Sequence, residues 1–278
     1  MIIDTHVHYD DEAFDSDREE IIGSLQENNI GFVLDVGSTK ESLPKIRGLI
    51  NRYDFVYGAM GLHPDEIGDL TDELLDELRE DMRNPKVLAV GEIGLDYYWN
   101  KEEKELQMAA FRRQIRLAQE CGKPVVIHSR EAAADTLNIV REMYGKGSLW
   151  EELHGTVPAH DRDAAGPAER KGVMHCYSYS VEQARIYTRE LGFYLGIGGV
   201  VTFKNAKKLK EVVADTPLEY LVLETDCPYL APVPYRGKRN ASLYLPHVVR
   251  AIAELKGVSC EEVEHVTEEN AKRLFRFP

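Results

Sequence analysis

Hydrophobic and polar positions divide the chain into a unit that recurs eight times. Each unit begins with a short run of β-branched or aromatic residues, continues through a loop, and ends in a stretch with apolar positions at helical spacing. Most of the short runs are almost continuously apolar, which is typical of parallel strands buried on both faces. The predicted strands are residues 2–8, 32–37, 55–61, 87–93, 124–128, 172–176, 193–197 and 220–224.

The intervening stretches predict helices between the strands. Thr71 illustrates the pattern, since a capping side chain there precedes apolar residues at Leu74, Leu75 and Leu78. The predicted helices span about residues 16–28, 41–52, 71–82, 101–120, 131–144, 181–191 and 206–213, followed by a pair near the C-terminus.

Strands that alternate with helices in this way predict an α/β fold, and eight repeats predict a (β/α)8 TIM barrel. An open doubly wound sheet is the alternative, but no predicted strand is followed by a Gly-x-Gly-x-x-Gly turn. The 278 residues match the usual length of one barrel, so residues 1–278 are expected to form a single domain.

The composition is that of a globular protein and excludes several classes. No apolar run of about 20 residues predicts a membrane span, and no basic and apolar leader predicts a secretory signal. The four cysteines are scattered, which favours reduced thiols and a cytoplasmic location over a disulfide framework. A monomer without a membrane partner is expected.

The net charge of −14 argues against broad, sequence-independent wrapping of duplex nucleic acid, because such binding needs a basic surface. The charge leaves room for a phosphate ester in a small site, since bound divalent cations would reverse the local field.

One connection departs from the repeat. Residues 145–171 are rich in glycine, proline, histidine and charge, and they are expected to form an irregular insertion or mobile loop. The segment contains His154, His160 and Asp161, but it connects a helix to the next strand. Such connections lie at the N-terminal face of a barrel, so a structural or partner-binding role is expected in place of a catalytic one.

Polar residues gather where the predicted strands end. His6 and His8 lie two residues apart on one strand, so their side chains share a face. A single histidine at a strand end is usually a core or solvated residue, but that explanation is implausible for many histidines and acids on one rim. The active site of a barrel lies at the C-terminal ends of its strands. The candidate metal ligands there are His6, His8, Glu92, His128, His175 and Asp226.

Nitrogen and carboxylate donors in one set suit Zn²⁺, Mn²⁺, Co²⁺ or Fe²⁺ better than Mg²⁺. The set is too large for one ion, so two divalent metal ions are expected, with zinc, manganese or magnesium as candidates. Such a pair clamps a phosphoryl oxygen and generates hydroxide near neutral pH, which is hydrolysis chemistry. The expected assignment is His6, His8 and Asp226 on one ion, His128 and His175 on the other, and Glu92 between them.

Six motifs follow the strands in order. They are Asp4-Thr5-His6-Val7-His8, Gly61-Leu62-His63-Pro64, Gly91-Glu92-Ile93-Gly94-Leu95-Asp96-Tyr97, His128-Ser129-Arg130, His175-Cys176-Tyr177-Ser178 and Glu224-Thr225-Asp226-Cys227-Pro228. This series resembles the TatD-type metal-dependent deoxyribonucleases, within the amidohydrolase-like barrels. His-x-His alone is a weak signal, but the six motifs together are highly specific and cover nearly the whole chain.

The resemblance implies a TIM barrel of the metallo-dependent hydrolase type that cleaves nucleic-acid phosphodiester bonds with two metals. It further implies a 3′ to 5′ exonuclease with single-stranded DNA as the substrate. In the family pattern Glu92 bridges the metals and Asp226 handles the proton of the attacking water, so these two are the expected catalytic residues.

The chain departs from the family pattern after His175, where Tyr177 replaces the usual Phe and Tyr179 the usual Gly. The bulky Tyr179 is expected to narrow the mouth of the site. The insertion at residues 145–171 is the other departure.

Four residues are candidates for binding the phosphate, because charge-assisted donors on an acidic protein must gather where the anion binds. They are His63, Arg130, Lys204 and Arg236. Tyr97 and Tyr98 are candidates for stacking on a base. Solvated surface cations and ordinary loop aromatics are the alternatives.

Two other classes of function fit such a barrel. An amidohydrolase, or a deacylase acting for example on mischarged aminoacyl-tRNA, uses similar chemistry. Amidase-type two-metal members typically bridge with a carbamylated lysine, whereas Glu92 stands in that place here and the strand has no lysine. A barrel that only binds metal or a partner would lack some ligands, and none is missing.

Overall fold

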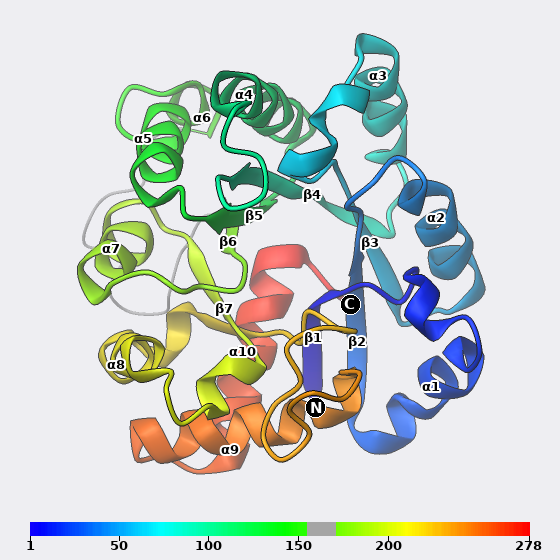
Figure 1. The fold of residues 1–278 in the computed structure, drawn as a ribbon, viewed down its shortest axis with the longest axis vertical. Coiled ribbons are helices and arrows are strands. Elements are labelled where there is room, and N and C mark those ends of the chain that lie inside the picture. The colour runs from blue at the N-terminus through cyan, green and yellow to red at the C-terminus, as the bar shows by residue number, and fades with distance from the viewer. Residues whose placement is uncertain (155–170) are drawn as a thin grey trace.

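Eight parallel strands form one sheet in which β1 through β8 are hydrogen-bonded in chain order (Figure 1). The computed structural model describes residues 1–154 and 171–278. Val7 at the end of β1 forms a bridge with Cys227, just after β8, so the sheet closes into a nearly complete barrel and the predicted fold is confirmed. The strands are β1 Ile2–Val7, β2 Ile30–Val36, β3 Val56–Met60, β4 Val87–Asp96, β5 Val125–Arg130, β6 Gly172–Met174, β7 Tyr194–Ile197 and β8 Leu221–Leu223.

Helices surround the barrel, as Figure 1 shows, and their burial follows the spacing in the sequence. Ahead of α3, the Thr71 hydroxyl accepts from the backbone N–H of Leu74 at 3.2 Å, and Leu74 and Leu78 are buried. The helices are α1 Arg18–Ser24, α2 Ser42–Arg52, α3 Asp72–Asp81, α4 Lys104–Cys121, α5 Ala133–Tyr144, α6 Leu149–His154, α7 Val181–Arg185, α8 Lys207–Asp215, α9 Leu245–Lys256 and α10 Cys260–Phe275. A π-helical turn, Ile186–Glu190, continues α7.

The barrel interior is closed at one end by apolar side chains. One buried cluster takes residues from all eight strands, for example Ile3 and Val126, together with Leu274, Phe275 and Phe277 from the end of the chain. A larger cluster lies between the strands and the surrounding helices. No helix in the described ranges is both long and apolar enough to cross a membrane. The polar ends of the strands lie at the other end of the barrel.

β4 and β5 run further than predicted, and this extension shapes the site. Their pairing continues from Gly94 and His128 to Asp96 and Arg130. Gly94 has a φ of +149°, and a Cβ there would lie 1.9 Å from the His128 carbonyl oxygen, so only glycine permits this close approach. The extended pairing brings Asp96 to the same rim as His128.

The expectation of an irregular segment over residues 145–171 is wrong for its first part, which contains α6. The Ser148 hydroxyl accepts from the N–H of Glu151, whose carboxylate accepts from the N–H of Gly147 at 2.6 Å, so the two side chains cap the start of this helix. Trp150 is buried, and its ring centroid lies 5.3 Å from that of Tyr144. Residues 155–170, with His160 and Asp161, lie outside the described residues.

Candidate metal centre

A cavity of about 760 Å³ opens at the C-terminal ends of the strands. Its walls come from residues at or after the ends of seven strands, with β7 as the exception. His6 does not line the cavity but is fully buried next to it. The other predicted site residues that line it are His8, His63, Glu92, His128, Arg130, His175 and Asp226.

Glu92 lies at the centre of this group. Its Oε2 is 3.5 Å from Nε2 of His6 and 3.9 Å from Nε2 of His8. Its Oε1 is 2.8 Å from Nδ1 of His128 and 3.8 Å from Nε2 of His175. The two oxygens of one buried carboxylate therefore face two separate pairs of imidazoles, which is the arrangement that a bridging metal ligand requires.

Two of the imidazoles are oriented by partners on their outer nitrogen. His8 donates from Nδ1 to the Val36 carbonyl at 2.9 Å, and His175 donates from Nδ1 to Oε2 of Glu224 at 3.1 Å. Such outer partners determine the tautomer and the direction of the ring. The Nε2 atoms of His8 and His175 consequently lie 3.5 and 3.6 Å from Oδ1 of Asp226.

His6 completes a donor set that fits a divalent cation. Its Nε2 is 3.1 Å from Nε2 of His8 and 3.8 Å from Oδ1 of Asp226, and its ring stacks on that of His175 at 3.5 Å. Imidazole nitrogens and carboxylate oxygens that converge in this way match the ligand preferences of zinc and similar metals. Residues of this group are also among those close enough together to share an ion.

His128 and His63 form the side of the site next to β4. His128 lies between two carboxylates, because its Nε2 is 3.1 Å from Oδ2 of Asp96 while its Nδ1 faces Glu92. Nδ1 of His63 accepts from the backbone N–H of Asp65 at 3.2 Å, so a neutral His63 carries its proton on Nε2. His63 can therefore donate a hydrogen bond to an anion in the cavity.

Burial and the surrounding carboxylates shift the protonation of the site. Burial opposes charge on His8, but Asp226, Glu92 and Asp10 outweigh it and raise its pKa to about 10. Burial likewise opposes charge on His128, yet Asp96 and Glu92 raise its pKa to about 9.

The pKa of Glu92 lies well below its usual value because the nearby histidines overcome the effect of burial. Burial and the neighbouring His128 lower the pKa of His63 to about 4, which keeps this histidine neutral. The centre thus strongly attracts positive charge, and divalent cations can supply it in place of protons.

Two of the predicted phosphate-binding residues lie outside the cavity. Lys204 and Arg236 are exposed and do not line it, and the guanidinium of Arg236 lies 4.4 Å from the ring centroid of Phe203. Their place beside the mouth depends on how the loops after β7 and β8 meet, which local sequence does not encode.

Two tyrosines, Tyr179 and Tyr97, differ from their expected roles. Tyr179 does not line the cavity, because its hydroxyl lies 2.9 Å from Oγ of Ser129, on the side facing β5. The expectation that it narrows the mouth is therefore wrong. Tyr97 is buried and donates to Asp135, so it cannot stack on a base, whereas Tyr98 is exposed. Tyr177 is buried as well.

Four residues of the site were not assigned from the sequence. Glu224 and Asp96 support His175 and His128. Asp96 follows Glu92 at an even spacing on β4, and Glu224 stands two residues before Asp226 just after β8, so closeness to a predicted ligand is the signal that could have found them. Trp99 and Tyr229 line the cavity rim and are strongly exposed, at 68% and 55%. An aromatic in a loop carries no such periodic signal.

The chain matches the model of the TatD related DNase family over residues 3–276. It belongs to this family. The chain is 42% identical over 277 residues to YabD of Bacillus subtilis strain 168, an uncharacterized metal-dependent hydrolase, with both chains covered in full. It is 35% identical to the uncharacterized metal-dependent hydrolase YcfH of Escherichia coli K12, covering 100% of this chain and 96% of YcfH.

Among solved structures, the chain is similar to YjjV, a TatD homologue from Escherichia coli K12. The TM-score is 0.84 at 29% identity, and the match covers 100% of this chain and 98% of YjjV. This TatD-type protein is accordingly a metal-dependent hydrolase built on a TIM barrel, and its strand-end donors fit that class.

Proposed function

We propose that this protein is a two-metal phosphodiesterase that removes nucleotides from single-stranded DNA, starting at the 3′ end. The observation that carries the proposal is the position of Glu92, whose two oxygens face two pairs of imidazoles. The family name, TatD related DNase, supports the choice of nucleic acid as substrate.

The proposed ligands are His6, His8 and Asp226 for one ion, His128 and His175 for the other, and Glu92 for both. When bound, the two ions supply Lewis acidity to a phosphoryl oxygen and a hydroxide nucleophile near neutral pH. Asp226 is suited to accept the proton of the attacking water, because 18% of its side chain is exposed, compared with 5% for Glu92.

Residues at the cavity wall are suited to hold the terminal nucleotide. The Nε2–H of His63 and the guanidinium of Arg130 are donors for non-bridging phosphate oxygens. Arg130 also lies over the ring of Tyr98, at 3.9 Å, and near that of Trp99, at 5.6 Å. The exposed face of Trp99 offers a platform on which a base can stack.

The proposal is tested with metal-stripped protein reloaded with one ion at a time, including zinc, manganese, cobalt and magnesium. The substrates are 5′-labelled single-stranded DNA, RNA of the same sequence, and a panel of small amides. We expect a ladder of shortened, still labelled DNA fragments, as cleavage from the 3′ end produces.

The Glu92→Gln protein, treated identically, controls for contaminating nucleases. Immediate release of the label as a mononucleotide would reverse the proposed polarity. Cleavage of the amides alone would contradict the proposed function.

A further inference from the structure

Exposed cations form a patch beside the mouth of the cavity. The patch consists of Lys204, Lys207, Lys208 and Arg236, hereafter the lysine patch. Within residues 1–154 and 171–278, no carboxylate forms an ion pair with any of these four side chains. The contact of Arg236 with the Phe203 ring joins the two loops that carry the patch. These charges are thus free to meet an anion.

The position of the lysines is unfavourable for the helix that carries them. α8 begins at Lys207 and has no acidic residue in its first turn. Cations are disfavoured there because the helix dipole has its positive end at the N-terminus. By contrast, α3 and α10 each carry two acidic residues in their first turn. On a chain of net charge −14, such a concentration of cations indicates that an external anion binds at this place.

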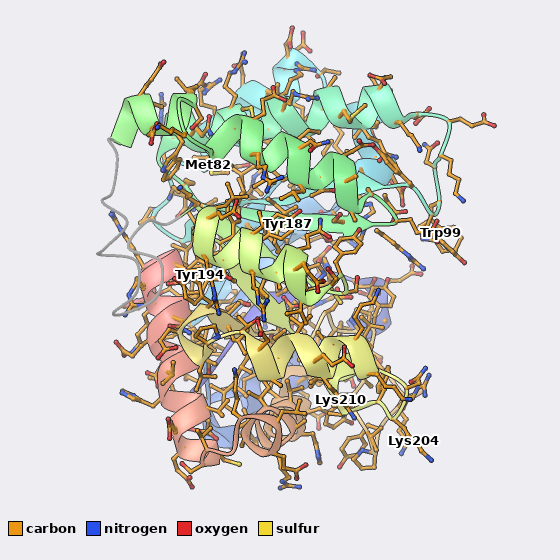
Figure 2. The ribbon with its side chains drawn as sticks, turned by 90° about the vertical axis from the view of Figure 1, so that its left-hand side faces the viewer. Met82, Trp99, Tyr187, Tyr194, Lys204 and Lys210 are labelled. Atoms are coloured by element: carbon orange, nitrogen blue, oxygen red, sulfur yellow. The ribbon has the colours of Figure 1, made fainter. Side chains whose placement is uncertain are left out.

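A second cavity lies next to both the patch and the main cavity. This cavity has a volume of about 270 Å³ and is lined by Lys208, Asn205 and Tyr177, among others. It shares Cys176 and Ser178 with the main cavity, so the two cavities lie side by side. Figure 2 shows Lys204 at the same end of the molecule as Trp99, with Lys210 set back along α8.

We propose that the lysine patch and the second cavity bind the nucleotides next to the scissile one in a single strand. The proposal rests on the proposed nuclease function and adds a subsite outside the metal centre. The lysines bind phosphates of the strand, and the second cavity takes one base or sugar, because its volume is just below that of a drug-sized ligand site. A lipid surface fits less well, since a bilayer cannot enter such a cavity.

The test compares the double variant Lys207→Gln/Lys208→Gln with wild type on two substrates. One is an oligothymidylate of about 16 nucleotides, the upper end of the site size of single-strand-binding folds. The other is the 4-nitrophenyl ester of thymidine 5′-monophosphate, which carries a single nucleotide and therefore reaches only the metal centre. We expect the KM for the long strand to rise about fourfold, since each of the two removed charges contributes a factor of about two. The effect should be confined to the long strand.

Salt dependence provides a second readout that needs no turnover. Binding of a fluorescent strand to metal-stripped protein is measured by anisotropy at several salt concentrations. The slope of log affinity against log salt should become shallower by about 1.4, because each phosphate contact on a single strand contributes about 0.7.

The matched control is the double variant Arg83→Gln/Lys146→Gln. Arg83 lies just after α3 and Lys146 just after α5, at the other end of the barrel. Both variants change the net charge from −14 to −16, that is −14 − 2, so a difference between them reports position and not total charge. Neutralising lysines at a helix N-terminus should not destabilise α8, and thermal unfolding verifies this.

The outcomes separate the two proposals. If wild type cleaves neither substrate, the nuclease function itself is wrong. If wild type cleaves both, but the Lys207/Lys208 variant retains the wild-type KM and salt slope, the subsite is wrong. Loss of binding to phosphatidylserine vesicles with an unchanged salt slope on DNA would assign the patch to a membrane surface and overturn the proposal.

Discussion

Four imidazoles enclose the carboxylate of Glu92, and only 5% of its side chain is exposed. A buried carboxylate is costly unless cationic partners compensate for its lost hydration. The histidines and acids of the site therefore act as one electrostatic unit, in which a change to one member alters the charge of the others.

Replacing Glu92 by Gln should abolish hydrolysis while the fold remains intact. An amide cannot bridge two cations as a carboxylate does. Loss of a residue that only hydrogen-bonds a metal ligand typically lowers metal affinity or activity about 10- to 100-fold, so loss of this ligand itself should lower activity further. Turnover, metal content and circular dichroism are measured together, with Asp226→Asn as the companion variant. Near-normal turnover in Glu92→Gln would mean that the bridging role is misassigned.

Glu224 should support the metal centre without touching substrate. Glu224→Gln replaces the charged acceptor of the His175 Nδ1–H by a neutral amide and so weakens this hydrogen bond. We expect metal affinity to fall about 10- to 100-fold. Gly196→Ala should act in the same direction, because a Cβ at Gly196 would lie 2.0 Å from Oε2 of Glu224.

The matched control for this pair is Gly48→Ala on α2, where a Cβ meets no atom within 4 Å. Metal titration compares the three variants. Equal metal affinity in all of them would exclude this role for Glu224.

His63 and Arg130 should contribute to capture of the substrate and not to metal binding. His63→Ala and Arg130→Ala each remove a donor at the cavity wall, and a hydrogen bond to a charged group contributes about 1.5–3 kcal/mol. We expect KM to rise by a factor of ten or more at unchanged metal content. Loss of one metal equivalent from His63→Ala would instead make His63 a ligand.

Helix α4 holds the chain at the ends of β3 and β4 through two buried glutamines. Gln107 and Gln114 are fully buried and lie about two turns apart on one face of the helix. Gln107 bonds both the N–H and the carbonyl of Asp96, and Gln114 does the same for Leu62, next to His63. One helix thus aligns the loops after β3 and β4 with each other.

Gln107→Leu should destabilise the protein and impair the site together. Two backbone groups of Asp96 lose their partner, at roughly 1–3 kcal/mol each, so the free energy of unfolding should fall by about 2–6 kcal/mol. Turnover should fall as well, because Asp96 supports His128. Urea unfolding and kinetics provide the two measurements.

Gln119→Leu serves as the control, because Gln119 lies on the same helix but bonds the Met143 carbonyl, away from the cavity. It should lower stability and leave turnover unchanged. Equal effects of both variants on turnover would show that α4 acts only through global stability.

In the barrel as a whole, the residues of the metal centre lie at one end and the connections from helices to strands at the other. The connection between α5 and β6 begins at the end of the barrel opposite the cavity, and none of its described residues lines that cavity. Trp150 of this connection instead packs on Tyr144.

Replacing residues 155–170 by a short Gly-Ser linker should leave metal content and cleavage of a short oligonucleotide unchanged, since closure entropy depends only weakly on loop length. Trp150→Ala, by contrast, should lower the free energy of unfolding by about 3–5 kcal/mol. Thermal unfolding and turnover distinguish these effects. A large loss of turnover in the still folded linker variant would place the connection in the active site.

The local sequence pattern was sufficient to predict the barrel and to predict that the candidate metal ligands lie close together at one rim. Apolar runs and helical spacing predict strands and helices because burial of one face imposes a period on the sequence. The period of two places His6 and His8 together, and barrel topology brings them to the rim that carries Glu92 and Asp226. α6 was missed although Ser148 and Glu151 have the spacing of a capping box.

Only the tertiary structure decided how the side chains are turned and which charges meet. The direction of the His175 ring depends on Glu224, 49 residues away. The surroundings of Glu92 depend on three strands, β1, β5 and β6, whose ends bring four imidazoles to its two carboxylate oxygens. The position of Lys204 beside the mouth, and not in it, depends on the packing of separate loops. Local sequence encodes periodicity and burial, whereas these orientations arise from hydrogen bonds and contacts between segments that are remote along the chain.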